Sequence, residues 1–146
     1  MGFFGDIGSG LARAQAAAVI ELLLARQVEY GVLEGQPREL AEHLVSQVWA
    51  QRPTLFEGKP GPRPHKLAVA AIALAAGIRH EAYRANAALQ DAYTLALGHV
   101  LEQVASRAAD LNLHDIDQRL LDLAAATFFS YPGSLPHEPH LDWFGL

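Results

Sequence analysis

The amino-acid sequence predicts an all-α fold, a single domain over residues 1–146 built as a bundle of about five helices with an extended, proline-rich C-terminal tail. Apolar residues recur at helical spacing along most of the chain, and no convincing run alternates apolar and polar residues as a half-buried strand would. Proline and glycine cluster at a few sites that separate the helical segments. Hydrophobic residues make up 51% of the 146, which is ample for a packed core.

The first helix is predicted over residues 9–34. Ser9 is a suitable N-cap residue, and Gly35 is a suitable stop signal after the last turn. Between Ala14 and Ala25 the helix is apolar on nearly all sides, and helices of this kind are usually buried on several sides. We therefore expect this helix in the centre of the bundle.

The second helix is predicted over residues 37–52. Pro37 suits the first helical position because it has no N–H group to leave without a partner. Pro53 disfavours helical geometry in the residue before it, so the helix should end there. The loop that follows, residues 53–65, is rich in proline and glycine and should form a stiff connector.

A third helix is predicted over residues 65–77, because residues 67–78 carry no polar side chain and should share the centre of the fold with the first helix. Gly77 should end or kink this helix. The fourth and fifth helices, predicted over residues 79–111 and 115–129, show apolar stripes of period 3.6. They should therefore be amphipathic covers, as should the second helix.

The tail, residues 130–146, combines prolines with large apolar side chains. A solvated tail would not normally carry so much apolar area, so we expect it to pack against its own domain or against a neighbouring subunit. Aromatic residues lie at both ends of the chain. The residues expected to contact a partner are Phe3, Phe4, Trp143 and Phe144.

The composition limits the cellular compartments and the classes of partner that are expected for this chain. The chain has no cysteine, so disulfides and thiolate chemistry are excluded. Its net charge is −5, and the acidic excess lies in residues 101–146, which a phosphate backbone would repel. We therefore expect no nucleic acid partner. The longest apolar stretches are shorter than the roughly 18 residues that a membrane span requires. We expect a cytoplasmic protein, and its use of alanine and arginine with two lysines suggests a bacterial source.

Glu21 is the first candidate functional residue, because it is the only charged residue between Arg13 and Arg26 on a helix that is expected to be buried. Removing a carboxylate from water is costly unless the group is paired or protonated. One interpretation is a ligand contact, a general base or a metal ligand. The other, which we favour, is a carboxylate paired with an arginine such as Arg84 or Arg107.

Asn86 and Gln90 lie one helical turn apart within the apolar stripe of the fourth helix, with Tyr93 on the same side. Buried amides need hydrogen-bond partners. With Glu21 they could line a polar pocket. The interpretation that we favour is that they fix the register of the helices or form a dimer contact.

Two weaker patterns remain. His137 and His140 form a short cluster with acids in the tail that could chelate a divalent ion, although two ligands alone make a weak site, and we expect no cofactor. Residues 73–78 could form the tight turn of a helix-turn-helix, with Arg79, His80 and Arg84 facing DNA. Against this, the predicted second helix is too long and the chain is acidic.

These observations favour a non-enzymatic, homo-oligomeric protein–protein interaction module of the adaptor, immunity or regulatory type, because apolar content is high and only 18% of the residues are charged. The first alternative is a small-molecule-binding protein or enzyme with a polar pocket around Glu21, Asn86 and Gln90. The second is a DNA-binding regulator.

Overall fold

The computed structural model of the chain describes residues 3–51, 64–83, 86–106 and 115–130. Within these ranges the structure contains five α-helices and no strand, which confirms the predicted all-α bundle. The tail beyond Ser130 lies outside the described residues. The helices are α1 (Phe3–Glu29), α2 (Pro37–Gln51), α3 (Pro64–Tyr83), α4 (Ala87–Ser106) and α5 (Asp115–Ser130).

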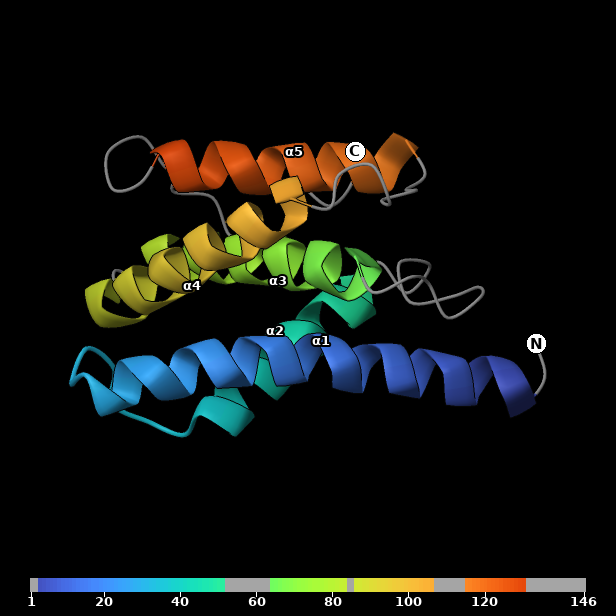
Figure 1. Cartoon of the computed structure of the whole chain (residues 1–146), viewed down its shortest axis with the longest axis horizontal. Coiled ribbons are helices and arrows are strands. Elements are labelled where there is room, and N and C mark those ends of the chain that lie inside the picture. The colour runs from blue at the N-terminus through green and yellow to red at the C-terminus, as the bar shows by residue number, and fades with distance from the viewer. Residues whose placement is uncertain (1–2, 52–63, 84–85, 107–114, 131–146) are drawn as a thin grey trace.

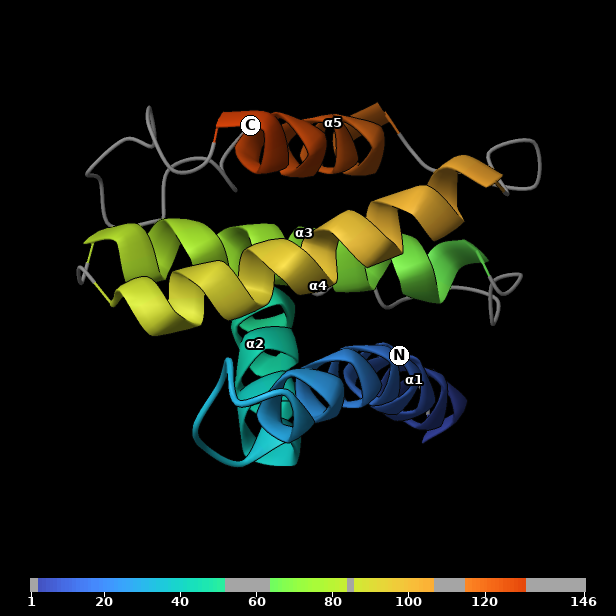
Figure 2. The ribbon, with the colours of Figure 1, turned by 60° about the vertical axis from the view of Figure 1, so that its left-hand side comes forward.

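The helices form layers (Figure 1). α5 is one outer layer, α3 and α4 form the middle, and α1 is the opposite outer layer. α2 runs across the others and contacts both α1 and α3 (Figure 2). The two outer layers therefore present separate surfaces on opposite sides of the molecule.

α3 is the centre of the fold, as predicted. It contacts each of the other four helices, and every residue from 67 to 78 is buried. A helix that is surrounded in this way has no polar face, which explains the run of alanine, leucine, isoleucine and valine. Among the described residues, no helix combines the length and apolar character that crossing a membrane requires.

α1 is not central, and the prediction that it would be is wrong. One face of α1 is buried and carries Ile20 and Leu24. The opposite face is exposed at Ala14 and Ala18, and Leu22 there is 60% exposed. α1 therefore has two apolar faces, of which the rest of the described chain covers one.

The ends of α1 also differ from the prediction. The helix begins at Phe3 rather than at residue 9. At its other end Gly31 has a φ of 78°, its N–H donates to the Val28 carbonyl, and the Val32 N–H donates to the Gln27 carbonyl. These two bonds form a Schellman motif, in which a glycine with positive φ ends a helix. The helix therefore ends before Gly31 and not at residue 34.

Gly77 neither ends nor kinks the third helix, because α3 continues through it to Tyr83. A Cβ added at Gly77 would lie 2.5 Å from Leu44 Cδ2 and 3.1 Å from the Tyr93 ring. Gly77 thus allows α2 and α4 to approach α3 closely. The predicted start of the fourth helix at residue 79 is wrong as well, because residues 79–83 belong to α3 and α4 begins at Ala87. α4 is described to Ser106, and its predicted end at residue 111 lies outside the described residues.

Candidate functional site

A pocket of about 330 Å³ lies between α1 and α2. Its α1 wall consists largely of alanines, whose short side chains leave the space open, and charged side chains stand around them. The pocket opens on the exposed side of α1, because Ala14 and Ala18 line it and are also exposed. The lining residues are Arg13, Ala14, Ala17, Ala18, Glu21, Arg38, Ala41, Glu42, Val45 and Ser46.

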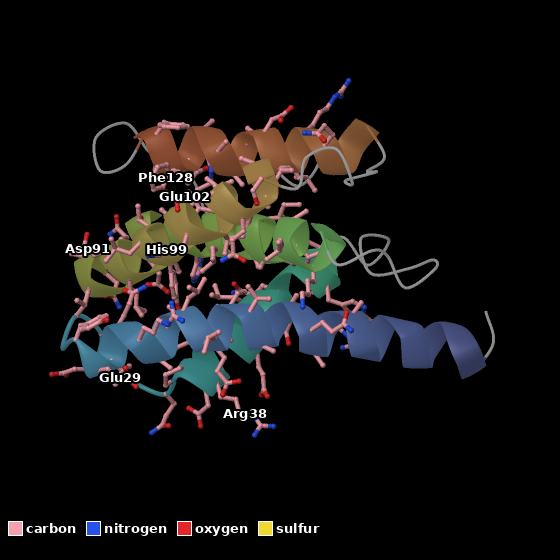
Figure 3. All side chains as sticks on the ribbon, viewed as in Figure 1. Glu29, Arg38, Asp91, His99, Glu102 and Phe128 are labelled. Carbon is pink, nitrogen blue, oxygen red and sulfur yellow. The ribbon has the colours of Figure 1, made fainter. Side chains whose placement is uncertain are left out.

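The charges in this pocket are balanced. Arg38 Nε donates to Glu42 Oε1 at 3.0 Å, one turn along α2 (Arg38 is labelled in Figure 3). This hydrogen bond and the negative charge of Glu42 raise the pKa of Arg38, and the charge of Glu21 raises it further. Because the Arg38–Glu42 pair is exposed, it contributes little to stability. It nevertheless places both charges at the pocket mouth.

Glu21 is half-buried at the edge of the pocket. The two arginines named as its candidate partners, Arg84 and Arg107, have side chains outside the described part of the chain. The second arginine of the pocket is Arg13, whose guanidinium carbon lies 4.4 Å from the centroid of the Trp49 ring. This cation–π contact holds Arg13 against α2. Arg13 Nε is buried and has no hydrogen-bond partner among the described residues.

Leu22 follows Glu21 on α1 and lies one helical turn after Ala18, so that Ala14, Ala18 and Leu22 form one exposed row along the helix. A protruding leucine thus stands beside a pocket that has an alanine wall. We refer to this surface as the α1–α2 face, consisting of Ala14, Ala18, Glu21, Leu22, Arg38 and Glu42.

A larger groove of about 680 Å³ runs between α4 and α5, on the side of the molecule opposite Arg38 (Figure 3). Its surface is mainly apolar, and polar side chains stand at its edges. The apolar lining includes Leu95, Leu101, Val104, Leu121, Phe128 and Phe129, and the polar lining consists of His99, Glu102, Gln118 and Asp122. We refer to it as the α4–α5 groove.

Gly98 sets the distance between the two helices at one point of this groove. A Cβ added there would lie 2.9 Å from Phe128 Cε2, so glycine allows the Phe128 ring to approach the α4 backbone. The Phe129 ring meets the Phe128 ring edge to face, with centroids 5.3 Å apart. Phe129 is 81% exposed and Leu95 is 51% exposed, so the groove has an uncovered apolar edge on each helix.

Asn86 and Gln90 join the end of α3 to the beginning of α4. Asn86 Oδ1 accepts a hydrogen bond from the Leu89 N–H at 3.3 Å, the geometry of an N-cap. Gln90 Nε2 donates to the Glu81 carbonyl at 3.3 Å, close to the end of α3. Tyr93 is 2% exposed, and burial, with a contribution from the charge of Glu81, raises its pKa to about 12. None of Asn86, Gln90 and Tyr93 is among the described residues that line the pocket around Glu21.

The remaining predicted site residues are not described at the side-chain level. Phe3 and Phe4 lie in the first turn of α1, and only their backbone is described. Residues beyond Ser130 lie outside the described ranges, and these include the candidate metal ligands His137 and His140 as well as Trp143 and Phe144. Within the described ranges, no group of three or more histidine, aspartate or glutamate residues could hold a metal ion.

The tight turn expected for a helix-turn-helix is absent at Gly77, since α3 runs through it. Arg79, which was expected to face DNA, is half-buried, and its Nε donates to Thr127 Oγ1 at 2.9 Å. Burial also lowers the pKa of Arg79. Within the described fold this arginine therefore links α3 to α5.

Sequence reasoning missed the α4–α5 groove. One signal was present, because Phe128 and Phe129 are adjacent and successive helical residues point about 100° apart. A single helix face therefore cannot bury both rings fully. Leu95 gave a second signal, since it is a large apolar residue that lies off the apolar stripe of the fourth helix.

Comparison with known proteins adds no identity: no family model, no curated protein and no solved structure matches this chain.

Proposed function

We propose that this chain is a non-enzymatic protein–protein interaction module that forms a homo-oligomer through its α1–α2 face. The observation that carries the proposal is Leu22, 60% exposed beside a pocket of about 330 Å³. The alanine-rich, lysine-poor composition of the chain is compatible with an adaptor, immunity or regulatory protein of a bacterial cytoplasm.

A second copy of the chain is the partner that fits this face best. Closed two-fold dimers are the commonest oligomers, and in them the same patch contacts itself. A protrusion and a pocket on one patch are complementary under that symmetry, because each Leu22 enters the pocket of the other copy. Exposed Ala14 and Ala18 would allow the two α1 helices to approach closely.

The charges of the face agree with self-association. The pocket holds two arginines, Arg13 and Arg38, and two glutamates, Glu21 and Glu42. A surface with equal numbers of both signs meets a copy of itself without net repulsion, and opposite charges can pair across the contact. The apolar outer side of α1 supplies the area that such a contact buries.

The alternatives have less support. A small-molecule site was expected to combine Glu21 with Asn86, Gln90 and Tyr93, but the pocket around Glu21 is lined by none of the last three. One of its arginines, Arg38, is already paired with Glu42. A DNA-binding surface would need Arg79 at the surface, whereas this residue is hydrogen-bonded to Thr127.

The test is the molar mass of the chain in solution, measured by light scattering over a range of micromolar concentrations. We expect a dimer for the wild type. The variant Leu22→Asp should be monomeric at the same concentrations. Removing two buried leucines, at about 1.5 kcal/mol each, corresponds to a dissociation constant weakened roughly 100-fold, and the charges repel in addition.

Leu95→Asp is the matched control, because Leu95 is also a helical leucine with an exposed side chain, and it lies in the other groove. We expect this variant to remain a dimer. Circular dichroism should show that both variants keep the helical content of the wild type. A monomeric wild type would refute the proposal, and so would a dimer that Leu95→Asp dissociates while Leu22→Asp does not.

A further inference from the structure

We infer that the α4–α5 groove is the docking site for residues 131–146 of the same chain. The groove lies on the opposite side of the molecule from the α1–α2 face, so the inference is independent of the proposed self-association. Its edges at Leu95 and Phe129 are exposed in the described structure. An apolar surface of this kind normally marks a contact.

The position of the tail is the first argument. α5 ends at Ser130, and Phe129 lines the groove, so residue 131 starts at one end of the groove. Pro132 and Gly133 follow at once, and proline then glycine is the order that a type II turn prefers at its two central positions. A turn at these two residues would reverse the chain and direct it back along α5.

The length of the tail is the second argument. Along α5 the groove extends from Gln118 to Phe129, about 17 Å at 1.5 Å per residue. Residues 131–146 can span about 50 Å when extended. The tail therefore reaches every part of the groove from its attachment point. Pro136 and Pro139 favour extended geometry, which lowers the entropy lost when the segment is fixed.

The chemistry of the tail is the third argument. It carries large apolar side chains, and the groove offers apolar walls from both helices; the tail residues concerned are Leu135, Leu141, Trp143, Phe144 and Leu146. The groove volume of about 680 Å³ lies within the range of pockets that bury most of a bound group.

The same chain is a better occupant than a second copy. A segment joined to the groove by a few residues has an effective concentration near the millimolar range. A second copy present at micromolar concentration competes poorly against that value. We therefore expect the tail to dock within its own chain. The burial of its side chains should then not change when the protein is diluted.

Fluorescence of Trp143 tests this inference in the full chain. The chain has two tryptophans, so Trp49→Phe leaves Trp143 as the single reporter and keeps an aromatic ring under Arg13. Leu22→Asp in the same chain keeps the measurement apart from self-association. We expect blue-shifted emission and acrylamide quenching several-fold weaker than for the same chain in urea. Both should be constant over a 100-fold dilution.

Adding Leu95→Asp and Phe129→Ser should expose Trp143 and raise its quenching to the value in urea. Tyr30→Ser is the matched control, because Tyr30 is an exposed aromatic residue (78%) away from the groove, and it should leave quenching unchanged. The inference is overturned if Trp143 is quenched freely in the starting chain, if the groove substitutions leave it protected, or if its protection falls on dilution. These results say nothing against the dimer, which the molar mass tests separately.

Discussion

At the scale of single residues, a polar residue within an apolar helical stripe has more than one explanation, and the surroundings choose between them. Asn86 and Gln90 are hydrogen-bonded to backbone groups at the α3–α4 corner, and Asn86 precedes α4 rather than lying inside it. The sequence spacing predicted that Asn86 and Gln90 lie on the same side of the chain. It could not predict how far they lie from Glu21, because the distance between α1 and α4 depends on how the helices pack and not on periodicity.

Tyr93 provides a pH-dependent prediction at this scale. Its pKa is 10.0 in the unfolded chain and about 12 in the folded one. Because the pKa of Tyr93 is higher in the folded chain, the folded chain keeps the phenol proton at a pH at which the unfolded chain loses it. The full stability is therefore present below pH 10 and is lost progressively as the pH rises from 10 to about 12. We expect the free energy of unfolding to fall by about 1 kcal/mol between pH 9 and pH 11 on account of Tyr93 alone.

Urea unfolding at the two pH values measures this fall, and Tyr93→Phe is the control. The variant should keep most of its stability at pH 9, because the phenylalanine ring fills the same buried position as the Tyr93 ring. Other tyrosines contribute equally to both proteins, so the difference between them isolates Tyr93. An equal fall in wild type and variant would show that the phenol of Tyr93 titrates alike in the folded and unfolded chains.

At the scale of the helices, the sequence predicted their number and most of their centres, but several of their ends were misplaced. The misplaced C-terminal ends of α1 and α3 share one cause, which is that glycine has two uses. Gly31 ends α1 through a positive φ, whereas Gly77 lies inside α3 because Leu44 and Tyr93 leave no room for a Cβ. The sequence shows a glycine in both cases. Only the residues that surround it in the folded chain show whether it ends a helix or allows another helix to pack closely.

The beginning of α4 can be tested by removing its N-cap. In Asn86→Ala the Leu89 N–H loses the Oδ1 acceptor, and a lost cap costs about 1 kcal/mol of folding free energy. Asn86→Asp keeps an acceptor and adds a negative charge at the positive end of the helix, so it should retain most of the stability. Urea unfolding measures both, and equal losses in the two variants would contradict the capping role.

At the scale of the whole molecule, the two surfaces differ in what the sequence could say about them. The run from Ala14 to Ala25 correctly indicated a helix with apolar sides all round, but burial by the same chain and burial by another copy leave identical patterns. In the structure Ile20 is buried within the chain, whereas Leu22 is exposed. The α4–α5 groove depends on how far two helices diverge, which no local pattern encodes.

Thermal unfolding can distinguish the two surfaces by mass action. A dimer that unfolds to two chains becomes more stable as the protein concentration rises, by about 2.7 kcal/mol of dimer for a 100-fold increase. For a dimer of 146-residue chains this corresponds to a rise in Tm of about 4 °C. The wild type and Leu95→Asp should both show the rise, whereas Leu22→Asp should show none. Docking of the tail within one chain adds stability at every concentration and cannot produce the dependence. A Tm that rises equally in all three proteins would place the self-association surface away from Leu22, and one that rises in none would leave the chain a monomer.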